Sequence, residues 1–319
     1  MKILVTIPNF TEAAKTTLTS AGEVFYQTPT QKSLPESLIG FDAALIGLGL
    51  NFNREVLTAA TRLRVIATAT TGLDHLDTAS AQKQGIEILS LRGEDEFLNS
   101  ITSTAELAFG LILNLMRNII PAAASVKRHE WDREHWRGHN LQGKTLGVVG
   151  VGRLGRMMVR YGLAFGMRVL GCDPNVDVTT IGAEKANFEE LVEKSDIISV
   201  HVHLTPKTEN LFNRSIFEKM KSTAYLINTS RGKIVNEDDL LEALINKKIA
   251  GYGADVLAGQ LEFDKKFNDY PLVEYAKAHD HCLIVPHLGG MTFESREATD
   301  IFMAKKLVDF ISQNLESRA

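Results

Sequence analysis

Short apolar runs alternate with amphipathic segments along the whole chain, and this alternation predicts an α/β fold. In the first hundred residues, segments 11–21 and 53–61 place apolar residues at helical spacing. The intervening apolar runs are typical of strands in a parallel sheet, and they cover 3–7, 43–47, 65–70 and 87–91. The pattern predicts a small domain with a parallel sheet.

A second series of strands follows a long apolar helix. In this helix Ser103 and Glu106 match the S-x-x-E capping box, and Pro121 is expected to end or kink it. A final amphipathic helix is expected over 291–317. The second series of strands is expected at 146–149, 167–172, 196–202, 224–229, 251–256 and 282–285, with helices such as 236–248 between them.

Residues 144–173 carry the most specific motif, a strand, a glycine turn, a helix, a second strand and a terminal acid. The turn GVGRLG places Gly150, Gly152 and Gly155 at the GxGxxG spacing of dinucleotide-binding folds. The first glycine permits a tight turn, the second lets backbone approach a pyrophosphate, and the third lets the helix pack close to the strand. The phosphates would lie at the helix N-terminus, whose free N–H groups favour anions.

Asp173 follows the second strand of this motif. Its carboxylate can accept hydrogen bonds from the adenosine ribose hydroxyls and would repel a 2′-phosphate, and CDPNVD places no Arg or Lys beside it. We therefore expect NAD rather than NADP as the cofactor. The glycines alone would also suit a turn in another α/β protein, and it is the strand, the helix and the acid together that favour a cofactor site.

The predicted fold class is α/β, with two Rossmann-like or flavodoxin-like parallel-sheet domains and a cleft between them. The C-terminal helix is expected to return to the first domain, which makes that domain discontinuous. The predicted domains are a substrate domain of residues 1–100 plus 288–319 and an NAD-binding Rossmann domain of residues 101–287.

Composition narrows the possible partners. The net charge of −4 and the scattered Lys and Arg predict no nucleic-acid binding. The start MKILVTIPNF lacks a full signal-peptide core, and the most apolar stretch, 107–116, is too short for a bilayer, so we expect a cytoplasmic protein without membrane contact. Cys172 and Cys282 lie at expected strand ends and suggest neither a disulfide nor a metal site.

Three motifs follow the later strands: NTSRG, GYGADV and VPHLGG. Ligands of open parallel sheets bind beyond the carboxyl ends of strands, so Arg231, Asp255 and His287 are expected to face one crevice. A guanidinium can hold a carboxylate by two hydrogen bonds, and an imidazole can exchange a hydroxyl proton near neutral pH. A lone Arg is usually a surface or salt-bridge residue, and a lone His is usually packed in the protein or exposed to solvent. Together with a nicotinamide they predict hydride transfer at a carbinol or carbonyl carbon.

The order GxGxxG, Asp, HVHLTPKT, INTSRG, GADV and VPHLGG resembles the D-isomer-specific 2-hydroxyacid dehydrogenases over nearly the whole chain. The resemblance implies an NAD-dependent oxidoreductase for a D-2-hydroxyacid or 2-oxoacid, with Arg231 anchoring the substrate and His287 as acid and base. It also implies a homodimer joined through the NAD-binding domain. The region of Trp131 and Trp136 would form part of the interface, with core packing as the alternative for these side chains.

The resemblance also implies further site residues. In ATTGLDHLD, backbone N–H groups around Thr71 and Gly72 would receive the substrate carboxylate. The implied cofactor contacts are Arg153 and Leu154 at the pyrophosphate, Thr205 and Pro206 at the adenine side, Thr229 and Ser230 at the nicotinamide ribose, and Thr104 and Asp255 towards the nicotinamide, with Gly289 and Gly290 of VPHLGG counted among them.

Gln260 departs from the family pattern, which usually has a Glu five residues after the Asp of the DV motif, hydrogen-bonded to the catalytic His. A carboxylate stabilises a protonated imidazole, whereas a neutral amide orients the ring without supplying charge. We therefore expect the pKa of His287 to be lower than in relatives with Glu, and ketone reduction to favour acidic pH. Glu262 could replace the carboxylate only if the loop shifts by two residues.

Two other functions stay open. Formate dehydrogenases of the family carry Gln at the position of Gln260, since formate oxidation needs no acid or base, but this chain is shorter and the segment after Gln260 is unlike theirs. A non-catalytic NAD-binding regulator is the second, and the presence of both Arg231 and His287 argues against it. The choice of hydroxyacid also stays open: Arg92 is the one plausible basic residue for a substrate phosphate, and a solvated loop residue is an equal alternative for it. The reaction direction stays open as well.

Two histidine pairs at strand spacing could suggest metal binding: His201 with His203, and His279 with His281. Neither pair is accompanied by an evident third ligand, so no metal is expected.

Overall fold

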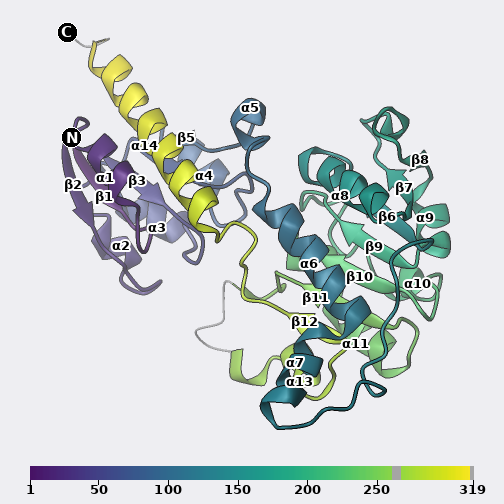
Figure 1. Ribbon diagram of the computed structural model, residues 1–319. Helices are drawn as coiled ribbons and strands as arrows, with labels where there is room; N and C mark the ends of the chain where they lie inside the picture. Colours follow the sequence, from purple (N-terminus) through teal and green to yellow (C-terminus); the bar gives the residue numbers. More distant parts are fainter. Residues whose placement is uncertain (261–266, 317–319) are drawn as a thin grey trace. The chain divides into compact units, whose positions relative to one another are not determined.

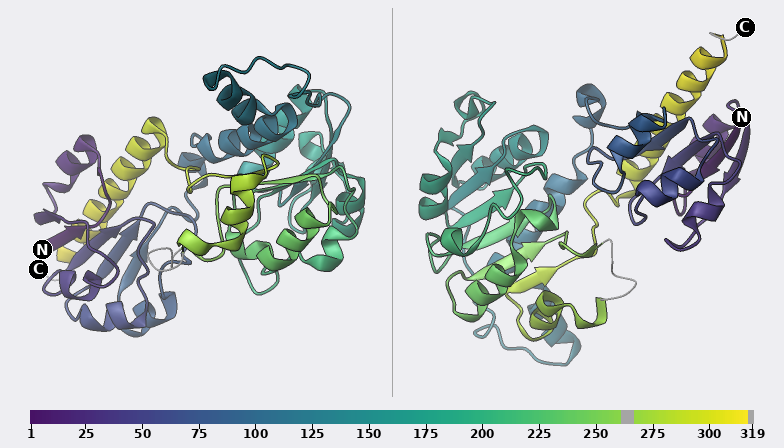
Figure 2. Two further views of the ribbon diagram at one scale, coloured as in Figure 1. Left: turned by 90° about the horizontal axis from the view of Figure 1, so that it is seen from below. Right: turned by 180° about the vertical axis from the view of Figure 1, so that it is seen from behind.

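The computed structural model describes residues 1–260 and 267–316 (Figure 1). The chain forms two compact units, the first made of residues 1–100 together with the chain from Thr292 onward, the second of Ile101–Met291. Each unit contains one parallel sheet with helices around it (Figure 2). The predicted fold class, two parallel-sheet α/β domains, is confirmed.

The sheet of the first unit is five-stranded and parallel, in the order β2-β1-β3-β4-β5. This is the strand order of flavodoxin-like folds. Its strands are β1 (Lys2–Val5), β2 (Glu23–Tyr26), β3 (Ala43–Ile46), β4 (Val65–Thr68) and β5 (Glu87–Leu89). Its helices are α1 (Glu12–Leu18), α2 (Leu34–Ser37), α3 (Arg54–Ala59), α4 (Thr78–Lys83), α5 (Asp95–Leu98) and α14 (Phe293–Glu316).

The return of α14 to the first unit follows from its contacts with α1, β4 and β5. The buried carboxylate of Asp300 on α14 accepts a hydrogen bond from the N–H of Thr11 at the start of α1 (3.3 Å). The sequence analysis did not predict the edge strand β2. None of its four side chains is fully buried, so EVFY forms neither a continuous apolar run nor a clear alternation.

The sheet of the second unit is seven-stranded and parallel, in the order β12-β11-β10-β9-β6-β7-β8. Its strands are β6 (Thr145–Val149), β7 (Arg168–Cys172), β8 (Glu184–Lys185), β9 (Ile197–Val200), β10 (Tyr225–Asn228), β11 (Gly251–Ala254) and β12 (Cys282–Ile284). Its helices are α6 (Ser103–Arg117), α7 (Ile119–Lys127), α8 (Arg153–Ala164), α9 (Phe188–Lys194), α10 (Arg214–Phe217), α11 (Glu237–Ile245) and α13 (Pro271–Ala278).

This order is that of a doubly wound dinucleotide-binding sheet with one strand added at the β12 edge. The order reverses between β6 and β9, which places the crevice for a ligand beside the turn that follows β6. Every residue of β6, β9 and β11 is buried, because one hydrophobic cluster packs on each face of the sheet. One cluster includes α6 and α8, and the other includes α9, α10 and α11.

The start and end of α6 differ from the sequence prediction. Ser103 is the first helical residue rather than the N-cap, so the predicted Ser103–Glu106 capping box is wrong. The hydroxyl of Thr102 donates to Glu106 instead (2.5 Å). The helix ends at Asn118 in the left-handed conformation (φ 52°), and Pro121 lies in the first turn of α7, where a missing N–H costs little.

Among the described residues, no single helix has the length and apolar composition needed to cross a membrane. One pair, Asp95–Arg117 with Ile119–Lys127, meets both conditions only when taken together across a 64° bend.

The second unit extends to Met291, whereas the sequence analysis drew this boundary after residue 287. The physical reason lies in Asp255, the residue that follows β11. Its carboxylate accepts hydrogen bonds from the N–H groups of Leu288 (2.5 Å) and Gly289 (2.8 Å), which hold this segment to the second unit.

Candidate active site

The predicted site residues of the second unit follow the carboxyl ends of its parallel strands. Because the strands run in one direction, these positions lie along the same edge of the sheet. In spatial order from β12 to β7 they include His287, Asp255, Arg231, Thr205, Gly150 and Asp173.

The glycine turn after β6 has the geometry of a phosphate-binding turn. Gly150 has φ +84°, and a Cβ there would lie 2.5 Å from the carbonyl oxygen of His201. A Cβ on Gly155 would lie 2.1 Å from the carbonyl oxygen of Gly150, so only glycine allows this close packing. At Gly152, the N-cap of α8, a Cβ would meet nothing within 4 Å. Backbone N–H groups are thus open to an anion at the helix N-terminus.

Asp173 borders this turn. Its Oδ2 accepts a hydrogen bond from the N–H of Val151 (2.7 Å) and its Oδ1 from that of Asn175 (2.8 Å). Each oxygen keeps acceptor capacity for a further donor such as a ribose hydroxyl. Further along the same edge, the buried hydroxyl of Thr229 has no hydrogen-bond partner among the described residues. These features fit a dinucleotide with hydroxyl-bearing riboses.

The other predicted cofactor residues occupy positions beside this turn or on neighbouring strand ends. Arg153 and Leu154 are the first residues of α8. The hydroxyl of Ser230, just after β10, donates to a backbone carbonyl of β9 (2.7 Å). Thr205 and Pro206 lie in an exposed loop after β9. Their roles as cofactor contacts stay predictions.

The backbone at His287 is left-handed, with φ 54°, a conformation that few residues other than glycine adopt. Its N–H group bonds to the carbonyl oxygens of Asp255 (3.0 Å) and Val285 (3.0 Å). Burial raises the pKa of Asp255 to about 6, against the opposing effect of its two backbone hydrogen bonds.

A Cβ on Gly289 would lie 2.9 Å from Asp255 and 3.0 Å from Thr104, so the structure brings these three predicted residues together. Gly290, the second glycine of VPHLGG predicted as a cofactor residue, follows Gly289 directly.

Gln260 contacts His287, as the sequence analysis expected. Gln260 Nε2 lies 3.0 Å from His287 Nδ1, and Gln260 Oε1 accepts a hydrogen bond from the N–H of Leu257 (3.3 Å). Burial lowers the pKa of His287 to about 4, and the positive charge of Arg231 lowers it further. The alternative partner considered from the sequence, Glu262, lies outside the described residues.

Arg231 is held by the turn between β10 and the 3₁₀ helix Gly232–Ile234. The side chain of Asn228 donates to its carbonyl oxygen (2.9 Å), and its own Nη1 donates to the carbonyl oxygen of Ser230 (2.7 Å). The structure thus assembles a permanent cation, an imidazole and an amide at one edge of the sheet, a set that can bind an anion and move a proton.

Thr71 and Gly72 belong to the first unit, in the turn that follows β4. The hydroxyl of Thr70 donates to the carbonyl oxygen of Gly72 (2.7 Å) and lies 3.0 Å from the hydroxyl of Thr68. These contacts fix the orientation of the peptide group between Gly72 and Leu73. Binding of a carboxylate there stays a prediction.

In the first histidine pair, the ring of His201 contacts a neighbouring side chain. His201 Nε2 contacts the hydroxyl of Ser199 (2.7 Å), and burial lowers the pKa of His201 to about 4, so its ring is neutral. Within 1–260 and 267–316, no group of three or more His, Cys, Asp or Glu is placed to hold a metal ion.

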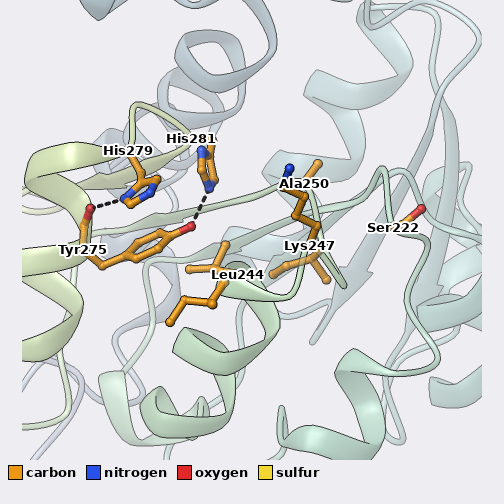
Figure 3. Close-up of a pocket in the computed structure, with 9 residues that line it drawn as sticks. Ser222, Leu244, Lys247, Ala250, Tyr275, His279 and His281 are labelled. Carbon is orange, nitrogen blue, oxygen red and sulfur yellow. Dashed lines mark hydrogen bonds between the residues drawn. The ribbon is translucent and has the colours of Figure 1, made fainter.

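A hollow of about 690 Å³ lies at the opposite edge of the sheet, where β11 and β12 begin. Figure 3 shows the hydroxyl of Tyr275 bonded to His281 (2.9 Å) there, while the ring of His279 stacks on Tyr275 at 3.9 Å. The hollow is therefore separate from the candidate active site.

The fold and the glycine turn define a dinucleotide-binding protein, and comparison with known proteins identifies its family. Residues 109–289 match the NAD binding domain of the D-isomer specific 2-hydroxyacid dehydrogenases. The D-3-phosphoglycerate dehydrogenase of Methanocaldococcus jannaschii is 36% identical over 312 residues, which cover 96% of this chain and 57% of that protein. The hydroxypyruvate reductase of Thermotoga maritima is 32% identical over 276 residues, 86% of this chain and 85% of that protein.

Among solved structures, a D-lactate dehydrogenase from Aquifex aeolicus complexed with NAD and lactic acid is similar, with a TM-score of 0.86 and 29% identity, over 99% of this chain and 97% of that one. The chain belongs to the D-isomer specific 2-hydroxyacid dehydrogenase family, and its second unit contains the NAD-binding domain. The chain spans about half the length of the curated D-3-phosphoglycerate dehydrogenases that it matches.

Proposed function

We propose that the protein is an NAD-dependent oxidoreductase that interconverts a 2-oxoacid and a D-2-hydroxyacid. The observation that carries this proposal is the contact of Gln260 with His287, close enough to Arg231 for the guanidinium to act on the imidazole. Membership of the family and the neighbouring NAD-binding turn support the same function.

The two charged or titratable side chains have separate tasks in this proposal. When bound, NADH supplies a hydride to the carbonyl carbon of the substrate. Arg231 holds the substrate carboxylate by two charge-assisted hydrogen bonds. His287 in its protonated form gives the proton on Nε2 to the carbonyl oxygen, and the product is the neutral hydroxyl. In the oxidation direction, His287 takes the hydroxyl proton on Nε2, for which the neutral ring must carry its own proton on Nδ1.

The test is NADH oxidation, followed by absorbance, with glyoxylate, hydroxypyruvate, pyruvate, 2-oxoglutarate and phosphohydroxypyruvate. The His287→Ala protein is the control. Turnover that is lost in this variant is the expected result, and the relative rates identify the substrate class. If no 2-oxoacid reacts although NADH binds tightly, the proposal fails, and formate oxidation or a regulatory role replaces it.

Cofactor choice gives a further prediction. Asp173→Asn is expected to lower the ratio of kcat/KM with NADH to that with NADPH by about tenfold or more, because it removes a negative charge beside the 2′ position. The amide oxygen can still accept a hydrogen bond from the N–H of Val151, which limits damage to the turn. Steady-state kinetics with both cofactors measure the ratio. Asp177→Asn, a charge change in the exposed segment that follows, should leave the ratio unchanged.

We also propose a homodimer joined through the NAD-binding domain. Large apolar side chains of α7 and the segment after it are exposed, with Ile120 at 49% and Trp131 at 87%. Trp136, in contrast, donates its indole N–H to Ser125 (3.1 Å) and packs within its own unit. Ile120→Glu is expected to convert a dimer to a monomer in sedimentation equilibrium, since it places a charge in an apolar contact. A monomeric wild-type protein would contradict the proposal.

A further inference from the structure

The contact between Gln260 and His287 has a defined polarity. The N–H of Leu257 is a donor, so the Gln260 oxygen faces Leu257 and the amide NH₂ group faces His287 Nδ1. An NH₂ group donates and does not accept. His287 Nδ1 therefore accepts this hydrogen bond, and in the neutral ring the proton resides on Nε2.

Two side chains outside this contact hold the backbone that carries Gln260. Glu237, the first residue of α11, accepts a hydrogen bond at Oε1 from the N–H of Ala258 (2.8 Å). The N–H of Gly259 donates to the hydroxyl of Tyr270 (3.1 Å), and this hydroxyl donates in turn to Oε2 of Glu237. Three consecutive N–H groups, from Leu257 to Gly259, thus bond to the side chains of Gln260, Glu237 and Tyr270.

The carboxyl group of Glu237 is buried, so the loss of these hydrogen bonds would be costly. Burial raises the pKa of Glu237, while the hydrogen bonds from Tyr270 and Ala258 favour the ionised form. A buried carboxylate that loses such donors is destabilised by its full desolvation penalty. Movement of the loop away from Glu237 is therefore strongly opposed.

The same loop is packed against the turn that carries Arg231. A Cβ on Gly232 would lie 2.1 Å from the carbonyl carbon of Leu257 and 2.2 Å from the nitrogen of Ala258, so the two backbones are in direct contact. The segment from Arg231 to Glu237 consequently supplies the substrate anchor at one end and the support of the Gln260 loop at the other.

We propose that Glu237 and Tyr270 are positioning residues: by bonding the N–H groups of Ala258 and Gly259, they hold Gln260 so that its amide keeps the His287 ring proton on Nε2. They contact neither substrate nor cofactor in this role and act through Gln260. The inference rests on the proposed function for its kinetic consequence but not for its structural one.

The experiment uses the full chain labelled with ¹⁵N-histidine and long-range ¹H–¹⁵N spectra, in which the His287 signals are assigned by their loss in His287→Gln. The wild-type ring is expected as the Nε2–H tautomer. Tyr270→Phe and Glu237→Ala are expected to mix the tautomers. They are also expected to raise kcat for reduction at neutral pH about tenfold, roughly the effect of one hydrogen bond, because a released Gln260 can turn its oxygen to accept from Nδ1–H of the protonated ring. KM for the oxoacid should stay nearly unchanged because Arg231 is untouched.

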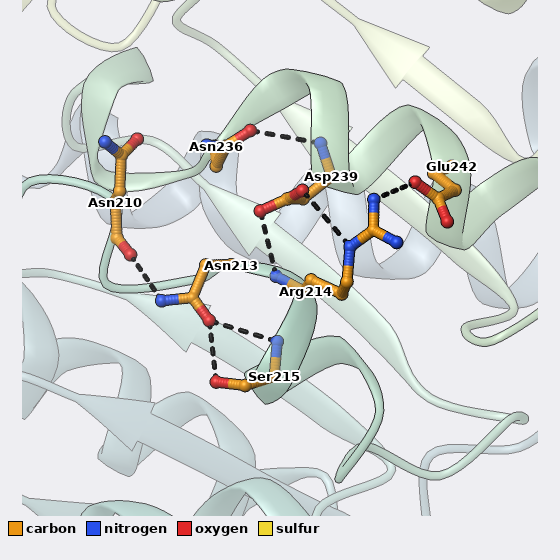
Figure 4. Close-up of polar contacts among 7 residues, drawn as sticks. All are labelled: Asn210, Asn213, Arg214, Ser215, Asn236, Asp239 and Glu242. Carbon is orange, nitrogen blue, oxygen red and sulfur yellow. Dashed lines mark hydrogen bonds and ion pairs between the residues drawn. The ribbon is translucent and has the colours of Figure 1, made fainter.

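Matched controls lie in the same unit. Tyr275→Phe removes a tyrosine hydroxyl at the opposite sheet edge (Figure 3), and Glu242→Ala removes a carboxylate on the exposed side of α11 (Figure 4). Neither is expected to change the His287 signals. If Tyr270→Phe does not fold, Glu237→Gln decides, since its amide oxygen can still bond Ala258 and should retain the wild-type tautomer more fully than Glu237→Ala.

The outcomes separate this inference from the proposed function. A His287 tautomer unchanged in Tyr270→Phe and Glu237→Ala overturns the positioning role, even if kcat changes. A tautomer that responds while no oxoacid is turned over upholds positioning and removes the proposed function. In a Gln260→Ala background, Tyr270→Phe is expected to cause no further change in kcat, and additive changes would contradict action through Gln260.

Discussion

Arg231→Gln is expected to lower kcat/KM for the preferred 2-oxoacid by about 10²–10³-fold, the effect of removing one member of a hydrogen-bonded charge pair. The glutamine retains hydrogen-bonding capacity but loses the charge and the two-pronged geometry that match a carboxylate. Arg231→Lys keeps the charge alone, so an intermediate loss is expected. Binding of NADH, measured by fluorescence titration, should stay within about twofold if Arg231 serves the substrate rather than the cofactor.

The control is Arg214→Gln. Arg214, on α10, pairs with Glu242 and Asp239 (Figure 4). Its side chain is 60% exposed. Such an exposed ion pair contributes about 0–1 kcal/mol to stability, so this variant should retain the wild-type kcat/KM. Equal losses in the two variants would mean that Arg231 does not anchor the substrate.

The sequence analysis predicted the strands correctly where consecutive residues are apolar and buried. Each strand of the second sheet except β8 produces an apolar run, because a strand covered on both faces must be apolar on both. Two edge strands were missed. In β2 no residue is fully buried, and β8 consists of two exposed charged residues, so neither produces an apolar run. The start of α6 was misplaced by one residue, because Thr102 and Ser103 are both suitable caps and the sequence does not distinguish them.

The candidate site was predictable in part. Arg231 and His287 follow strands of a parallel sheet, so the carboxyl-end rule placed them on one edge, and the resemblance added Gln260. Glu237 and Tyr270 carried no comparable signal. They bond to Ala258 and Gly259 across 21 and 11 residues. A Glu in the first turn of a helix is ordinarily an exposed residue that favours the helix dipole, and only the packing of the loop buries this one.

Gln260→Glu is expected to move the pH dependence of ketone reduction upward by about one to three pH units, the usual effect of an opposite charge at this distance. Reduction requires protonated His287, whose pKa is about 4 because of burial and Arg231, so wild-type activity should fall with rising pH from the acidic range. A carboxylate at position 260 favours the imidazolium and raises this pKa. The variant should therefore reduce the 2-oxoacid faster than the wild type at neutral pH, and its oxidation optimum should move to higher pH.

The orientation of the Gln260 amide gives a second reason to expect this shift in pH dependence. With the Gln260 amide donating to Nδ1, the neutral ring carries its proton on Nε2, and protonation adds a proton at Nδ1, where it meets the NH₂ group. The amide must then turn its oxygen towards His287 and give up its bond to Leu257. A carboxylate accepts from Nδ1–H without turning. Profiles of kcat/KM from pH 4 to 9 measure the difference, with Gln82→Glu on exposed α4 as the matched charge control. A midpoint unchanged in Gln260→Glu, or wild-type reduction that stays flat well above neutrality, would show that position 260 does not set the proton affinity of His287.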